Sequence, residues 1–412
     1  MSHSCEEKEI TSELFATPET KLMQALKRAE RFAEEKEAHK AQRELIQCTA
    51  LTRIIYGNRH WKLAQALANL AHSYLVLQGL PVQTMQHANS AKCIIFSGGS
   101  TPPASSEERR EILSTLVTIY YSLGVAHLKQ KNSKKSYCSL RKAKSIMEEL
   151  QELDWSRTPE LKVSEKDLNA ALGRACLQQN KMELAIRHFK KAINAVISSE
   201  GEMAPELINL YKKIAQTEQV KKNNEKSIEY LLHAYSIALA VHKKSSTEAA
   251  SIALLLGKAY AATGEEQYSE VAETYFSESL AAYKVALGMD HPLTIDALKD
   301  FSKWLICAGK REHAYNLLKE SFQLHLDPCS DFNEKAAERF YIMGCICLSE
   351  GKMKEAYQLF SKCVQIQVIV YGSQYRKTKD IQKLLDVLKK SPAVLEGIRH
   401  MKPKGEEVLT PS

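Results

Sequence analysis

A repeated ten-residue pattern constrains the fold of this chain more than any other feature. The stretch GKREHAYNLL begins at Gly309, and GKMKEAYQLF begins 42 residues later at Gly351. The same arrangement of small and large residues recurs eight times between residues 22 and 370. A period of about 20 to 50 residues is typical of proteins built from stacked structural repeats. The sequence therefore predicts an array of similar units.

Each unit is predicted to be a helical hairpin, with helix A, a short turn and helix B. Apolar residues recur at every third and fourth position, and Gly (16) and Pro (11) are scarce. Strand patterns are nearly absent, so we expect an all-α fold. The eight predicted units lie near residues 22–55, 62–96, 115–150, 166–199, 207–241, 249–286, 294–326 and 336–370.

Small residues mark three equivalent positions in every unit. The late-A position holds Ala29, Ala71, Gly124, Gly173, Ala215, Gly257, Ser302 and Gly344. The early-B position holds Ala41, Thr84, Ser136, Ala185, Ser227, Ala272, Ala314 and Ala356. The late-B position holds Cys48, Ala91, Ala143, Ala192, Ala234, Ser279, Ser321 and Cys363. Small residues at these positions allow two helices to approach closely.

One position between early-B and late-B carries a large residue in seven of the eight units. This knob position holds Leu45, Ala88, Leu140, Phe189, Leu231, Phe276, Leu318 and Phe360. We expect the knob to fill the space beside the late-A residue. The second and sixth units fit the pattern only with short insertions in their turns.

The late-A positions follow one another at intervals of 42, 53, 49, 42, 42, 45 and 42 residues. The longest interval contains SGGSTPPASSEE, predicted to be an internal loop at 97–108. Residues 1–18 are expected to be a flexible start and 391–412 a disordered tail. The last unit leaves an apolar face open, and we expect residues 375–390 to form an amphipathic capping helix over it. The repeat array then extends over residues 19–390.

Composition excludes several classes of protein. The chain has 412 residues, 44% of them hydrophobic, and a formal net charge of +8, which is too mild to indicate nucleic-acid binding. We expect no membrane insertion, because no apolar run of about 18 to 20 residues is evident and the start lacks a hydrophobic signal core. The ten cysteines lack framework spacing, which favours a reducing, cytoplasmic location.

Motifs of catalytic and metal-binding chemistry are absent from the sequence. It holds no Gly-rich phosphate loop, HExxH, paired CxxC or GxSxG. Cys345 and Cys347 are two residues apart on a predicted helix, so they face different sides. His291 is expected to shape its linker, and Trp61 and Trp304 are expected to be core residues. We therefore predict no enzyme activity, cofactor, metal or small-molecule substrate.

These repeats resemble the tetratricopeptide repeat. The 42-residue spacing and the linkers YGNRHWK (56–62), LGMDHPLT (287–294) and YGSQYRKT (371–378) are similar to those of kinesin light chains. The stretch from Glu44 to Leu75 resembles the tetratricopeptide repeat protein 23 and 23-like family. This resemblance implies a right-handed α-solenoid with a concave groove lined by the A helices. It also implies a cytoskeletal setting, such as the centrosome, the spindle or midbody, or the base of the cilium.

Partner-binding residues are expected on the A helices, beside the late-A positions. Five basic residues follow this face from the fourth to the seventh unit: Arg174, Lys212, Lys258, Lys299 and Lys303. We call them the basic stripe and predict that it receives an acidic or helical segment of a partner protein, with Tyr121 and Tyr341 as flanking aromatic contacts. The alternative is a solvated charged face, since Asp296 and Asp300 lie beside two of these lysines.

Three functions follow from these expectations. The first is a non-enzymatic scaffold that binds partner proteins in the groove. The second is a cargo or motor adaptor like the kinesin light chains, which use a heptad coiled coil that residues 1–40 are too short to form. The third is self-association through the open ends of the array.

Overall fold

A computed structural model describes residues 17–97, 105–152, 161–289, 291–323, 334–392 and 394–395, apart from the side chains of residues 321–323 and 335. These residues form 17 α-helices and no strand. The chain divides into two compact units, unit 1 up to Lys221 and unit 2 from Lys222 onward. The predicted all-α fold is confirmed.

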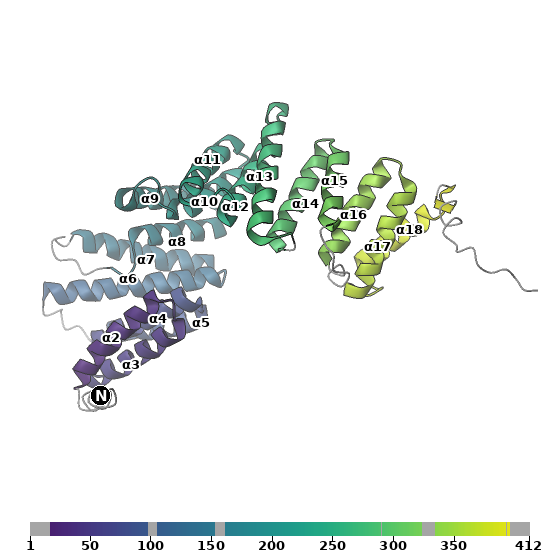
Figure 1. Cartoon of the computed structure of the whole chain (residues 1–412). Coiled ribbons are helices and arrows are strands. Elements are labelled where there is room, and N and C mark those ends of the chain that lie inside the picture. Colours follow the sequence, from purple (N-terminus) through teal and green to yellow (C-terminus); the bar gives the residue numbers. More distant parts are fainter. Residues whose placement is uncertain are drawn as a thin grey trace, which may run out of the picture. The chain divides into compact units, whose positions relative to one another are not determined.

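Unit 1 is built from nine α-helices in the residues described, and consecutive helices pack against each other as antiparallel hairpins (Figure 1). They are α2 (Pro18–Glu34), α3 (Ala38–Tyr56), α4 (Trp61–Ser73), α5 (Pro81–Ser97), α6 (Ser106–Lys129), α7 (Ser133–Glu152), α8 (Glu165–Gln178), α9 (Met182–Glu200) and α10 (Glu206–Val220). Helix α10 is the A helix of the fifth predicted hairpin, and unit 1 ends in the turn after it.

Unit 2 continues the alternation of A and B helices and begins with the B helix of the fifth hairpin. Its helices are α11 (Asn224–Val241), α12 (Thr247–Ala261), α13 (Ser269–Leu287), α14 (Pro292–Cys307), α15 (Arg311–Gln323), α16 (Glu334–Ser349), α17 (Met353–Tyr371) and α18 (Arg376–Leu388). Each of α12, α14 and α16 packs against the B helix that follows it.

The predicted contact between the late-A residue and the knob is confirmed in the four hairpins that have glycine at late-A. A Cβ atom placed on Gly173 would lie 2.7 Å from the Phe189 ring, and one on Gly344 would lie 2.8 Å from the Phe360 ring. Gly124 faces Leu140 and Gly257 faces Phe276 in the same way. Late-A, early-B and late-B residues are all buried wherever their side chains are described. Small residues are thus required because the backbones approach closely.

The turn between helix A and helix B uses a left-handed residue seven places after late-A. Gly309 and Gly351, which open the repeated ten-residue stretches, have φ of +78° and +76°. Glycine adopts this conformation without steric cost. Lys36, Lys131, Asn180 and Lys222 occupy the same position with φ between 58° and 62°. The repeated stretches therefore begin with glycine because the turn begins there.

The insertions expected in the second and sixth helical hairpins are local changes of helix type. In the second, a π-helix at Tyr74–Gln78 follows α4, and Ala71 and Thr84 are 13 residues apart instead of the usual 12. A π-turn accommodates one extra residue within a helix. In the sixth, a 3-10 turn at Glu266–Tyr268 precedes α13. Both devices restore the packing of the B helix.

Polar side chains cap several A helices and correct two predicted boundaries. Ser105 Oγ accepts a hydrogen bond from the Glu108 backbone N–H at 3.1 Å, so α6 begins inside the range 97–108 that was predicted as a loop. Thr17 caps α2 likewise, so residues 17 and 18 are not part of a flexible start. Residues 1–16 and 98–104 lie outside the described residues.

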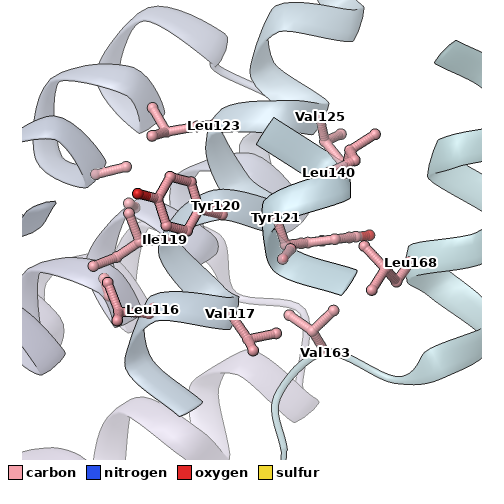
Figure 2. Close-up of a cluster of buried hydrophobic side chains, with 14 of the residues drawn as sticks. Leu116, Val117, Ile119, Tyr120, Tyr121, Leu123, Val125, Leu140, Val163 and Leu168 are labelled. Carbon is pink, nitrogen blue, oxygen red and sulfur yellow. The ribbon is translucent and has the colours of Figure 1, made fainter. Parts of the chain in front are cut away.

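Helix α6 is the core helix of unit 1. Every residue from Thr115 to Ala126 is buried, because α6 contacts α4, α5, α7 and α8 on different sides. Figure 2 shows its side chains leaving the helix in several directions, with Tyr121 pointing toward Leu168. By length and mean hydropathy α6 alone among the described helices could cross a membrane, contrary to the expectation of no such stretch, but 72% of its most apolar window is buried within the protein.

Helix α18 occupies the place of a ninth A helix. It packs against α17, burying Thr378, Ile381 and Leu388, as expected for the predicted cap. The chain beyond it is not wholly a disordered tail, because Val394 is 1% exposed and its N–H donates to the Ser391 carbonyl at 3.1 Å. Residues 396–412 lie outside the described residues.

Candidate interaction surface

The described residues form three hollows that each lie between an A helix and the next A helix, at equivalent positions of the repeat. We name them the N-terminal hollow (between α2 and α4), the middle hollow (between α8 and α10) and the C-terminal hollow (between α16 and α18). The residue three places before late-A lines each one: Leu26, Ala170 and Tyr341. So does the residue four places after late-B: Thr52, Val196 and Gln367. The hollows thus share their backbone geometry and differ in side chains.

The N-terminal hollow combines an aliphatic wall with polar side chains, those of Thr52, Lys62, Gln65, Asn69 and Glu111. Its volume is about 300 Å³, and Leu22, Leu26 and Leu45 line it together with the buried Cys48. Burial, with the nearby carboxylate of Glu44, raises the pKa of Cys48 to about 11, so the thiol stays protonated and unreactive. The wall formed by the three leucines suits an aliphatic group.

The middle hollow carries more positive than negative side chains. Its volume is about 340 Å³, and its charged lining residues are Lys166, Arg174, Lys213, Asp167 and Glu206. Lys166 Nζ lies 2.7 Å from Glu200 Oε1 and 2.5 Å from Glu206 Oε2, and these hydrogen bonds raise the pKa of its ammonium. Arg174 is exposed, and its Nε donates only to the carbonyl of Ala170 at 3.4 Å. Its guanidinium has no carboxylate partner among the described residues.

The C-terminal hollow carries more negative than positive side chains. Its volume is about 430 Å³, and its charged lining residues are Lys299, Lys377, Glu334, Glu338 and Asp380. Lys299 forms an ion pair with Glu338. The Tyr371 hydroxyl donates to the Glu334 carboxylate, and this hydrogen bond raises the pKa of Tyr371 to about 12. Ala337 and Ile381 supply its aliphatic surface.

In unit 1 the structure brings only part of the basic stripe to a hollow. Arg174 lines the middle hollow, whereas Lys212 is half-buried and interacts with a neighbouring group, and Lys213 lines the hollow in its place. Tyr121 is 9% exposed, within the core around α6, and burial raises its pKa to about 12. It has little surface to offer as a flanking contact, because the apolar neighbours of α6 enclose it.

In unit 2 acidic neighbours neutralise two of the three stripe lysines. Lys258 lies 2.5 Å from Asp300 on α14, and Lys299 pairs with Glu338 on α16. Lys303 is exposed and has no ion pair among the described residues. Tyr341 is 41% exposed at the C-terminal hollow, as its predicted role requires. The pairing between successive A helices fits the alternative of a solvated charged face better than a continuous basic stripe.

Of the residues that line the C-terminal hollow, sequence reasoning named only Lys299 and Tyr341 and missed the rest, including Gln367, Tyr371 and Asp380. A signal for Tyr371 was present, because Tyr56 of the N-terminal hollow stands eight places after late-B, as Tyr371 does. Both tyrosines begin the linkers YGNRHWK and YGSQYRKT. Gln367 gave no such signal, since a glutamine on helix B reads as a solvent-exposed residue.

A half-buried histidine stands on α4, next to the late-A position. His72 packs against Tyr121 with ring centroids 6.0 Å apart, and its Nδ1 atom is buried without a hydrogen-bond partner among the described residues. Burial, and then the nearby Lys162 ammonium, lowers the pKa of His72 to about 4. The imidazole is therefore neutral at physiological pH.

The residues singled out for possible chemistry have structural roles. No group of three or more potential metal ligands occurs in the described part of the chain. Cys345 is exposed and Cys347 is buried, as the two-residue spacing predicted. His291 Nδ1 accepts from the Leu293 N–H at 3.2 Å and caps α14, and His60 caps α4 in the same manner. Trp304 packs on Phe276 and Phe301, in line with its predicted core role.

Comparison with known proteins agrees with this geometry. A family model described as tetratricopeptide repeat matches residues 167–195 and 337–367, which lie in the hairpins α8–α9 and α16–α17. An apo form of RapI has the same fold, with a TM-score of 0.58 and 11% identity, over 92% of this chain and 97% of that one. At this identity the likeness concerns the fold alone.

Two curated relatives align over nearly the whole chain. The 23-like tetratricopeptide repeat protein of Mus musculus is 42% identical over 92% of this chain and 82% of its own length. Tetratricopeptide repeat protein 23 of Homo sapiens is 31% identical over 93% of this chain and 85% of its own. The repeats, their packing and these alignments agree: the chain belongs to the tetratricopeptide repeat protein 23 and 23-like family.

Proposed function

We propose that this protein is a non-enzymatic scaffold whose A-helix hollows each receive side chains from a segment of a partner protein. Its repeats are those of protein-interaction scaffolds. One observation carries the proposal: the same hollow occurs at three equivalent junctions with three different linings. A repeated backbone with varied side chains is what the recognition of different side chains requires.

Unit 1 supports the expectation of an acidic segment more strongly than unit 2 does. Arg174 and Lys213 line the middle hollow without a carboxylate partner among the described residues. In unit 2 the equivalent charges of Lys258 and Lys299 are already compensated. We therefore place the acidic segment at the middle hollow and treat Lys212 and Lys303 as peripheral to it.

The setting that we propose is a cytoplasmic assembly associated with the cytoskeleton, at the centrosome, the spindle or midbody, or the base of the cilium. Family resemblance supports this setting. Electrostatic recognition of acidic segments also fits a scaffold that binds partners reversibly, because charged contacts raise association rates.

Proximity labelling with the full chain, in dividing and in ciliated cells, tests both parts of the proposal. The informative variant is Arg174→Glu with Lys213→Glu, which reverses the charge of the middle hollow. The matched control is Arg187→Glu with Lys191→Glu, two exposed residues on α9 that lie outside the hollow. We expect labelled cytoskeletal proteins to be lost with the first variant and kept with the second. Identical label sets for all three proteins would refute the role of the hollow.

A further inference from the structure

The C-terminal hollow contains a buried hydrogen-bond acceptor without a partner. Gln367 is 8% exposed and lines the hollow, and its Oε1 has no hydrogen-bond partner among the described residues. A buried polar atom left unpaired is destabilising, so proteins rarely keep one without a use. The terminal torsion of glutamine is soft, and a small rotation turns this oxygen toward an occupant. A group that pairs with this oxygen must be a hydrogen-bond donor.

The charges around the hollow favour a donor that is positively charged. Three carboxylates, those of Glu334, Glu338 and Asp380, line it against two ammonium groups. The ion pair with Glu338 already uses Lys299, and Lys377 is exposed, as Asp380 is. Glu334 receives only the neutral hydroxyl of Tyr371 among its described contacts. One negative charge in excess therefore remains among the lining side chains, which favours a cation over an anion.

Aromatic rings form part of the wall of the same hollow. Tyr341 and Tyr371 both line it, and each keeps more than a third of its surface exposed. The ring of Tyr375 stacks on Tyr371 at a centroid distance of 4.6 Å, which holds that ring in place. Exposed, fixed tyrosine faces attract cations, and a planar cation can also stack on them.

We propose that the C-terminal hollow binds the guanidinium group of an arginine side chain in a partner polypeptide. This inference rests on the proposed function, because it assumes that a polypeptide enters the hollow. Arginine fits better than lysine because its flat group can stack on tyrosine while its several N–H donors reach the carboxylates and the Gln367 oxygen together. The middle hollow, at the equivalent junction, has the opposite charge balance and does not select arginine.

Selection of random 16-residue peptides displayed on phage against the full chain tests the inference without a known partner. The best peptides are then synthesised, each arginine is replaced in turn by citrulline or lysine, and the dissociation constants are measured. Citrulline keeps the shape of arginine and removes its charge. We expect one arginine whose change to citrulline weakens binding at least about tenfold, the loss expected for a charged hydrogen bond, and whose change to lysine weakens it less.

Protein variants locate that arginine in the hollow. Asp380→Asn changes an exposed residue, and Gln367→Leu removes the unpaired oxygen. Each variant is expected to bind the arginine peptide several-fold more weakly than the unaltered protein does. Binding of the citrulline form of the peptide should be the same in all three proteins. Arg174→Gln in the middle hollow is the matched control and should not weaken binding of the arginine peptide. Selected peptides that bind without any arginine dependence would overturn this inference but leave the proposed function in place. If no peptide is enriched, both fall.

Discussion

The hairpins α8–α9 and α16–α17 are alike in their buried residues and unlike in the hollows beside them. Each has glycine at late-A, alanine at early-B and a phenylalanine knob that is almost fully buried. The distances from an added Cβ to the knob ring, 2.7 Å at Gly173 and 2.8 Å at Gly344, are nearly the same. The first hairpin contributes Arg174 to the middle hollow, and the second contributes Tyr341 and Gln367 to the C-terminal hollow.

This contrast separates two demands on the repeat. Helix packing fixes volume at the late-A, early-B, late-B and knob positions, so these vary little between hairpins. Side chains at the hollows face solvent or a partner and are free to differ in charge and shape. A substitution at a packing position should therefore lower stability alike in both hairpins. A substitution at a residue that lines a hollow should change binding in that hollow only.

Removal of the knob is the most severe test of the shared packing. Phe189→Ala in unit 1 and Phe360→Ala in unit 2 should each lower the free energy of unfolding by about 3 to 5 kcal/mol, because each leaves a cavity in a close-packed junction. Urea unfolding followed by circular dichroism measures the loss, and hydrogen exchange should rise in the altered unit. Phe96→Ala is the control, since Phe96 is 63% exposed. A loss no larger than that of the control would contradict the assigned packing.

Overfilling the same junction should cost somewhat less. Gly173→Val and Gly344→Val add a side chain whose Cβ alone would lie within 2.8 Å of the knob ring. We expect each to lower the free energy of unfolding by about 2 to 3 kcal/mol. Gly257→Val should cost less, because an added Cβ there lies 3.0 Å from Phe276. Ala50→Val, at an exposed position of α3, controls for the β-branched side chain. Equal effects at all four sites would show that the knob contact does not limit the packing.

Burial in the fold could be predicted from the sequence because packing restricts residue size. Every late-A residue is buried where it was predicted to be, and the glycines face the predicted knobs. The turn insertions were also visible as changes of spacing, although their forms, a π-helix and a 3-10 turn, were not. The helix caps at Ser105 and Thr17 were missed because capping serines and threonines resemble loop residues in composition.

The candidate site was less predictable because its properties depend on contacts between helices. A lysine on one A helix cannot reveal that a carboxylate on the next will reach it, as Asp300 reaches Lys258. Tyr121 was predicted to be a flanking aromatic contact on the face of its A helix, and α6 is instead enclosed on several sides. The unpaired oxygen of Gln367 arises only when α16, α17 and α18 come together.

Acid should destabilise unit 1 through its half-buried histidines. Burial lowers the pKa values of His72 and His188 to about 4, and lowers those of His87 and His127. Between pH 6.5 and 4 an unfolded chain binds protons at His72 and His188 that the folded chain does not, so the free energy of unfolding falls as the pH is lowered. From pH 7.5 to 5.5 the loss should be about 1 kcal/mol for each of the two.

Urea unfolding at the two pH values checks this dependence. In His72→Gln the loss on acidification should shrink by about 1 kcal/mol, and His188→Gln should act alike, with His188 beside Asn169 at 3.4 Å. An unchanged pH dependence in both variants would mean that neither imidazole is held neutral by burial. The result sharpens the contrast between the two units, because the histidines with lowered pKa values in the described residues all lie in unit 1.

The smallest expected change in stability carries the sharpest distinction between the two hollows. Lys166→Gln and Lys299→Gln each break partly exposed ion pairs, so each should lower the free energy of unfolding by no more than about 0.5 kcal/mol. Yet the first variant makes the middle hollow less basic, whereas the second frees Glu338 and makes the C-terminal hollow more acidic. Binding of an acidic peptide should weaken in the first, and binding of an arginine peptide should tighten in the second. Lys144→Gln, which removes the pair with Glu148 on α7, should change neither, since ion pairs outside the hollows contribute only to stability.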